Sequence, residues 1–165
     1  MYSNTNSDIT DISFIDELTG CVSLITGECL FTTDGGNSWI PKLNTGLTDA
    51  SSVQVLNGKW LMTSADGKVV ESSNLGATWQ QVSQGGSAVE SFTASSLSSP
   101  TSGLVVGANG AIYRYTSGNL TAESSGTTAN LNAVIDNGSW AMAVGDNANI
   151  VKNSGGGWNL QSTGT

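Results

Sequence analysis

The stretch Thr32-Thr33-Asp34-Gly35-Gly36-Asn37-Ser38-Trp39 has the residues of a tight turn that closes on an aromatic side chain. Forty residues later, Ser72-Ser73-Asn74-Leu75-Gly76-Ala77-Thr78-Trp79 repeats its order of small hydroxyl, Asp or Asn, Gly, Ser or Thr, and Trp. An Asp or Asn side chain can accept hydrogen bonds from the backbone N–H groups that follow it. Gly supplies a backbone angle that other residues resist. We therefore predict that each stretch joins two antiparallel strands and that its Trp packs back under the loop.

Ten residues receive this structural role. They are Thr32, Asp34, Gly36, Ser38 and Trp39 in the first stretch, and Ser72, Asn74, Gly76, Thr78 and Trp79 in the second.

A hairpin pattern extends outward from these turns. Residues 20–33 and 103–116 align without a gap, and two further segments, 60–73 and 141–154, fit the same template of apolar strand, turn and apolar strand. One more strand is predicted before each hairpin (9–16, 51–56, 88–94, 131–136) and one after it (39–43, 79–82, 120–123, 158–161). Four strands per unit, at a period of about 40 residues, are typical of propeller blades.

The predicted fold is all-β: a small β-propeller of four four-stranded antiparallel blades in a single domain, 1–165. The repeat units are 9–46, 47–85, 86–126 and 127–165. Charged residues make up 11% of the chain, against roughly 25% in an average domain, which leaves Ser, Thr, Asn and Gly to cover the surface. We expect the four blades to close as a ring within one chain; the alternative is a partial ring that a second chain completes, so an oligomer stays open.

Charge and residue content exclude several classes of partner and chemistry. The net charge is −8 with five cationic residues, so nucleic acid and anionic membranes are poor partners. The chain has no histidine, which removes the commonest general base and metal ligand. Residues 1–8 have neither a basic region nor an apolar core, so no signal peptide is predicted. No apolar run approaches the roughly 18 residues that a membrane span needs.

Two cysteines, Cys21 and Cys29, lie in the first hairpin. With a turn at Thr26 and Gly27, Cys29 is expected opposite Leu24, and Cys21 opposite Thr32. The two sulfurs are then about 10 Å apart along the strands, beyond the reach of a disulfide. We predict two buried thiols and a reducing compartment.

Residues 11–16, Gly20 and the stretch 32–39 resemble Asp-box (BNR) repeats, most similar to those of photosystem II assembly factors of the Ycf48 type. The resemblance covers nearly the whole chain as a repeat architecture. It implies a propeller whose box lies at the periphery of each blade and has a structural role. Sialidases, sortilin-like receptors and phage structural proteins share these repeats, so the motif says little about function.

Two departures limit what the resemblance implies. The glycosidase members hold a carboxylated sugar with three arginines, whereas Arg114 is the only arginine here, so sialidase activity is excluded. The assembly factors are longer and have a basic patch, so their function is not transferred either.

The remaining candidates for chemistry have structural interpretations that we favour. Glu28, Asp34 and Asp66 can be read as a carboxylate cluster for a metal or for acid–base catalysis, but turn capping explains them as well. Trp60 and Trp140 occupy matching places in two units and can be read as a sugar-stacking platform, although a core position is commoner. We predict no catalytic, metal-binding or cofactor-binding residue and no cofactor.

We therefore predict a non-enzymatic structural or interaction protein. The specific expectation is a phage virion component, such as a capsid decoration or knob-like protein on the virion surface, with a capsid or other virion protein as its partner. Otherwise the chain is expected to be soluble and cytoplasmic. The alternatives are a carbohydrate-binding, lectin-like propeller and an assembly-factor-like propeller that binds protein.

Overall fold

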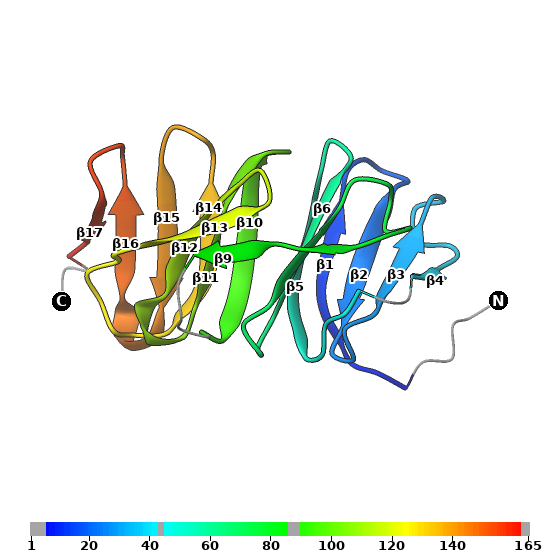
Figure 1. Cartoon of the computed structure of the whole chain (residues 1–165), viewed down its shortest axis with the longest axis horizontal. Helices are drawn as coiled ribbons and strands as arrows, with labels where there is room; N and C mark the ends of the chain where they lie inside the picture. Colours follow the sequence, from blue (N-terminus) through cyan, green and yellow to red (C-terminus); the bar gives the residue numbers. More distant parts are fainter. Residues whose placement is uncertain (1–5, 43–44, 86–89, 163–165) are drawn as a thin grey trace.

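The computed structural model describes residues 6–42, 45–85 and 90–162, which form four sheets side by side (Figure 1). The first sheet contains β1 (Ile9–Phe14), β2 (Gly20–Leu24), β3 (Cys29–Thr32) and β4 (Ile40–Lys42). The second contains β5 (Ala50–Leu56), β6 (Lys59–Ser64), β7 (Val69–Ser72) and β8 (Gln80–Gln81). The third contains β10 (Phe92–Ser99), β11 (Ser102–Gly107), β12 (Ile112–Thr116) and β13 (Asn119–Glu123), with β9 (Ser83–Gly85) at its edge. The fourth contains β14 (Leu131–Asp136), β15 (Ala141–Gly145), β16 (Ile150–Asn153) and β17 (Trp158–Leu160).

The strands within each blade follow one another in chain order and pair antiparallel. Two short 3-10 helices, η1 (Ala108–Gly110) and η2 (Asp146–Ala148), stand in the hairpin turns of the third and fourth blades. The predicted propeller of four four-stranded blades is confirmed. Residues 1–5, 43–44, 86–89 and 163–165, including parts of the predicted first strand of the third unit and of the last unit, lie outside the described residues.

One connection differs from the prediction. Residues 83–85 follow the predicted strand 79–82, and no strand was predicted for them; they form β9, which pairs parallel with β13 from Asn119 to Thr121. The chain that leaves the second blade therefore adds a fifth strand to the outer edge of the third blade. This pairing ties the two blades together and covers an otherwise open strand edge.

The first strand of each blade lies at the inside of an arc. These inner strands pack in the order β1, β5, β10, β14, and polar side chains link each to the next. The backbone N–H of Val53 donates to Asp11 Oδ2 at 2.9 Å, that of Ser95 to Ser52 Oγ at 3.2 Å, and that of Asp136 to Ser96 Oγ at 3.0 Å. The inner strands therefore carry Ser and Asp where a core strand would be expected to carry Val or Ile.

Three apolar clusters fill the spaces between neighbouring blades. Phe31, Trp60 and Met62 belong to the cluster between the first and second blades. The second and third blades enclose Leu61 and Tyr115, and the third and fourth enclose Leu104 and Val151. Each of the two internal blades thus presents one apolar face to the blade before it and another to the blade after it.

The predicted closure into a four-bladed ring is wrong for the described residues. The first and fourth sheets extend toward opposite ends of the molecule, and the chain termini lie at those two ends (Figure 1). β1 lacks against β14 the packing that the other neighbouring inner strands have, and none of the clusters joins the first blade to the fourth. The four blades therefore form an open arc.

The first hairpin is displaced by one residue from the predicted register. Cys21 pairs with Phe31 and Cys29 with Ser23, because the turn closes with a hydrogen bond from the N–H of Leu24 to the carbonyl of Glu28. The main expectation is nevertheless confirmed, since both cysteines are buried and form no disulfide. Burial, followed by the nearby Cys29, raises the pKa of the Cys21 thiol, so this thiol stays protonated at neutral pH.

Candidate functional site

The only arginine of the chain, Arg114, lies in the middle of β12 on the face that the third blade turns toward the fourth. Its guanidinium binds Glu123 at two points, with Nε–Oε1 at 2.6 Å and Nη2–Oε2 at 3.4 Å. The hydrogen bond to Glu123 is the main cause of the raised pKa of Arg114. This two-point contact fixes the plane of the guanidinium and leaves Nη1 directed at the next blade.

Asp136, the last residue of β14, receives that remaining nitrogen. Its Oδ2 lies 3.5 Å from Arg114 Nη1 and 3.2 Å from Ser98 Oγ, and its Oδ1 accepts the backbone N–H of Gly138 at 2.9 Å. Only 4% of the Asp136 side chain is exposed. The ion pair therefore crosses from the third blade to the fourth with its Asp136 end buried and its Arg114 end 31% exposed.

Trp158 of the fourth blade also contacts the ion pair of Arg114 and Glu123, because its indole N–H donates to Glu123 Oε2 at 2.7 Å. We refer to the charged groups of Arg114, Glu123 and Asp136 as the cluster. Asp136 and Trp158 of the fourth blade thus contact, respectively, the Arg114 and Glu123 ends of the ion pair in the third blade. The cluster contains two carboxylates and one guanidinium, so its net charge is −1.

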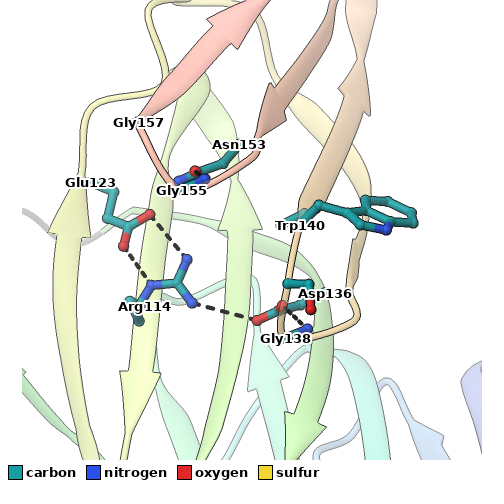
Figure 2. A pocket seen from close by; sticks show the side chains of 10 residues that line it. Arg114, Glu123, Asp136, Gly138, Trp140, Asn153, Gly155 and Gly157 are labelled. Atoms are coloured by element: carbon teal, nitrogen blue, oxygen red, sulfur yellow. Dashed lines mark hydrogen bonds and ion pairs between the residues drawn. The ribbon is translucent and has the colours of Figure 1, made fainter.

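A cavity of about 240 Å³ opens beside this cluster. Its walls are Arg114, Glu123 and Asp136, the turn before β15 (138–141), and Asn153, Gly155 and Gly157 in the turn before β17. Figure 2 shows Arg114 between the two carboxylates, whereas the ring of Trp140 points away from them. Trp140 is 37% exposed, and its indole therefore lies beside the cavity, on the far side of the turn from the polar wall (Figure 2).

The sequence analysis considered Arg114 only as the single arginine of a chain that would need three for a sialidase site. The local signal was present, since Arg114 interrupts the otherwise apolar and aromatic run of β12. A charged residue inside such a strand requires a partner of opposite charge. The identity of the partner came only from the packing of blades, because Asp136 is 22 residues away in another sheet.

The loops 32–39 and 72–79, which we call the rim loops, share one hydrogen-bond pattern. In the first, Thr32 Oγ1 donates to Asp34 Oδ1 at 2.8 Å and accepts the N–H of Gly36 at 2.9 Å. Asp34 Oδ1 also accepts the N–H of Ser38 at 2.9 Å, and Asp34 Oδ2 accepts its hydroxyl at 2.6 Å. These loops join the third and fourth strands of their blades, at the outer rim.

The second loop repeats these contacts with an amide in place of the carboxylate. Ser72 Oγ donates to Asn74 Oδ1 at 2.9 Å and accepts the N–H of Gly76 at 3.0 Å. Asn74 Oδ1 accepts the N–H of Thr78 at 3.0 Å, and its amide donates to Thr78 Oγ1 at 2.8 Å. One geometry therefore serves a charged and a neutral side chain.

Because the first loop has Asp34 where the second has Asn74, exchanging the two residues tests how the carboxylate affects the pH dependence of stability. Hydrogen bonds from Ser38, side chain first and then backbone, hold the pKa of Asp34 at about 2, below its ordinary value of 3.8. A carboxyl whose pKa falls on folding stabilises the protein above its unfolded pKa, and this stabilisation is lost as the pH falls toward the folded value. We expect urea unfolding to show the stability advantage of wild type over Asp34→Asn shrinking between pH 5 and pH 2.

The matched variant Asn74→Asp should acquire a pH dependence of the same sign in the second loop. An advantage of wild type over Asp34→Asn that stays constant through this range would contradict the assignment. The loop would then hold Asp34 by geometry alone.

Trp60 occupies the core position that we favoured and is not accessible for stacking on a sugar, because its side chain is fully buried against Phe31 and Trp79, with ring centroids at 5.3 and 6.2 Å. Trp60 pairs with Ser72, whereas Ala141, not Trp140, pairs with Asn153 at the matching place of the fourth blade. A shift of one residue moves a side chain to the other face of a sheet. Trp140 therefore remains as the single exposed indole of that pair.

The proposed carboxylate cluster does not assemble. Asp34 lies in the rim loop of the first blade, and Asp66 lies in a turn of the second, where Lys68 Nζ contacts it at 2.6 Å. Across residues 6–42, 45–85 and 90–162, no three His, Cys, Asp or Glu side chains come close enough to hold a metal ion. Over the same residues, none of the helices has the length and apolar character to cross a membrane.

Comparison with protein-family models gives no match, and neither does comparison with curated proteins. Among solved structures, the chain is similar to YCF48 bound to a D1 peptide, with a TM-score of 0.79 and 22% identity, over 100% of this chain and 56% of the other. YCF48 from Cyanidioschyzon merolae matches with a TM-score of 0.75 and 18% identity, over 99% of this chain and 59% of the other.

The WD40 repeats of RRP9 match with a TM-score of 0.80 at 8% identity, over 98% of this chain and 55% of the other. At these identities the likenesses show the propeller fold. The chain spans less than two thirds of each of the three proteins, so its arc corresponds to part of a longer chain in every case.

Proposed function

We propose that this propeller is a non-catalytic module that binds a protein partner through a positively charged segment. The observation that carries the proposal is the acidic cavity beside Arg114, where two carboxylates outnumber one guanidinium and the turn that carries the exposed Trp140 forms part of the wall. The YCF48 structure with a bound D1 peptide supports peptide binding as a use of this fold. The WD40 match is a further interaction-type propeller that supports the proposal.

The distribution of charge favours a cationic partner. Lys59 pairs with Glu71 at 3.3 Å, Lys68 with Asp66 at 2.6 Å, and Arg114 with Glu123. These pairs neutralise cations in a chain that already has a net charge of −8, so the excess negative charge faces solvent. Such a field accelerates encounters with basic segments and opposes acidic ones.

The arrangement at the cavity also favours binding over catalysis. Both carboxylates of the cluster accept hydrogen bonds from Arg114, and Ser98, Gly138 and Trp158 donate further hydrogen bonds to them. A general acid or base needs a free position next to the reacting proton. These carboxylates instead hold the two blades together and give the cavity its charge.

An array of synthetic peptides of graded net charge tests the proposal. We expect binders to be enriched in Lys and Arg with an aromatic residue, and their affinity to fall roughly tenfold between 50 and 500 mM NaCl because the attraction is screened. Trp140→Ala should weaken binding by about tenfold or more, since an exposed indole beside a cavity is a typical contact hot spot.

Leu75→Ala, in the rim loop of the second blade, is the matched control and should leave the affinity unchanged. Binding of acidic and basic peptides alike, or full affinity in Trp140→Ala, would overturn the proposal. Turnover of aryl glycosides or sialosides by the purified protein would overturn its non-catalytic part.

The narrower prediction of a phage virion component stays a prediction, because none of the three similar structures is a virion protein. The lectin alternative is weaker because Trp60, one of the two tryptophans considered for sugar stacking, is buried. The structural role of the two rim loops as Asp-box repeats remains part of the proposal, and their shared hydrogen bonds support it.

A further inference from the structure

The open arc leaves two blade faces without a neighbour. Each internal blade buries both of its faces, whereas the first blade has no blade before it and the fourth has none after it. The register of the strands identifies the residues that project from these two faces, because successive side chains of a strand alternate between the faces of its sheet.

On the first blade, Ile12 pairs with Val22, which pairs with Leu30. The corresponding ladder of the second blade, Val53 to Met62 to Val70, is buried against the first blade. We call the residues of the first ladder, together with Phe14 and Trp39, the N-terminal end face. These positions thus belong to a surface that is an inter-blade interface elsewhere in the same molecule.

On the fourth blade, Ile135 pairs with Met142, which pairs with Lys152, and Val144 pairs with Ile150. These five residues define the C-terminal end face. Their counterparts on the third blade, such as Leu104, Val106 and Ile112, are buried against the fourth.

Both end faces carry exposed apolar side chains, although Val22 and Leu30, at 3% and 8% exposed, are covered within the first blade, where Trp39 packs on them. Ile12 is 57% exposed where its counterpart Val53 is 0% exposed, and Val144 is 39% exposed where Val106 is 0%. Phe14 is 38% and Ile135 51% exposed. Contiguous exposed apolar side chains of this kind mark interaction surfaces.

We infer that a second copy of this chain covers these faces, the C-terminal end face of each copy packing on the N-terminal end face of the other. The two faces are the two halves of the interface that the molecule already builds three times between its own blades. The outer strands of the first and fourth blades, β4 and β17, lie at opposite ends of the molecule (Figure 1), so both end faces border the open side of the arc. A two-fold axis through this open side then brings the C-terminal end face of each copy onto the N-terminal end face of the other. A closed assembly of this kind leaves no free face from which a fibre could grow.

Charge does not oppose this pairing. The ten positions of the two faces contain no carboxylate, and their one charged residue is Lys152. Lys152 occupies in the fourth blade the ladder position that Arg114 occupies in the third. Phe14 occupies in the first blade the position that Asp136 occupies in the fourth. Lys152 of one copy therefore lies opposite Phe14 of the other, where an ammonium can stack on the aromatic ring. Depletion of carboxylates, in a protein with thirteen of them, is typical of the centre of an interface.

The mass in solution tests the inference without any ligand, so its failure is distinct from failure of the peptide-binding proposal. We expect light scattering at about 100 µM to give twice the 16.9 kDa of one chain, and Ile12→Glu and Val144→Glu each to give the monomer, because a buried unpaired charge is costly. Leu75→Glu, exposed on a central blade, is the control and should keep the doubled mass.

A mixture of the two variants distinguishes the pairing of unlike faces from that of like faces. The Ile12→Glu chain keeps an intact C-terminal end face and the Val144→Glu chain an intact N-terminal one, so the mixture should form mixed dimers that neither variant forms alone. A monomeric wild type, or loss of the dimer in only one of the two variants, would overturn the inference. A monomer would assign these faces to a different protein or to further blades.

Discussion

Replacing Trp60 with alanine is expected to lower the free energy of unfolding by about 4 kcal/mol. The side chain is 0% exposed and sits in the cluster between the first and second blades, where its ring meets Phe31 and Trp79. Removing an indole from such a place loses its apolar burial and leaves a cavity that rigid sheets on both sides cannot fill. Because the cluster joins two blades, the loss should weaken the arc as well as the second sheet.

Urea unfolding followed by circular dichroism measures this change, and Trp140→Ala supplies the control. The two variants delete the same side chain, but Trp140 is 37% exposed, so its removal should cost no more than about 1 kcal/mol. Equal costs for the two variants would show that Trp60 does not hold the blades together.

The contrast between these tryptophans also shows what the sequence could and could not predict. The repeat of hairpins and turns was readable because each blade depends on local signals, such as an apolar ladder, a Gly-containing turn and, in the first two blades, a hydroxyl residue directly before a Trp. The face on which a given Trp lies depends on register, and one residue of displacement separates Trp60 from the position of Trp140. Alignment by spacing alone places the two together.

The third inner strand shows a different limit. It was expected over 88–94 but begins at Phe92 and continues to Ser99. Its second half, Ser95-Ser96-Leu97-Ser98-Ser99, has the composition of a loop. In the arc these serines form hydrogen bonds to the neighbouring inner strands, including Ser52 and Asp136. The partners that make a polar strand stable lie in other blades, so no local pattern could reveal them.

Closure is a third property that depends on the whole assembly. Each blade pairs with the next through contacts that the sequence partly encodes, but the angle between blades follows from the sizes of all the buried side chains. Small residues such as Ala141 and Ala143 in one interface, and Trp60 in another, set these angles together. Counting repeats therefore predicted four blades correctly and a four-bladed ring incorrectly.

Arg114→Met is expected to lower the free energy of unfolding by about 3 kcal/mol. The guanidinium is the counter-charge of Asp136, whose side chain is 4% exposed, and of Glu123. Methionine fills part of the space but leaves two carboxylates facing each other across the third and fourth blades. Arg114→Lys should recover only part of the loss, because an ammonium cannot reproduce the two-point contact with Glu123.

A double-mutant cycle separates the ion pair from simple packing. In the wild type, Asp136→Asn removes a charge that Arg114 neutralises, while the amide oxygen still accepts the N–H of Gly138. In the Arg114→Met background the same change removes an uncompensated buried charge, so it should cost less or even stabilise. We expect a coupling free energy of about 1 to 3 kcal/mol from urea unfolding at pH 7. Additive effects would mean that Arg114 contributes through the packing of its aliphatic stem, and that the charge beside the cavity is free to vary without loosening the blades.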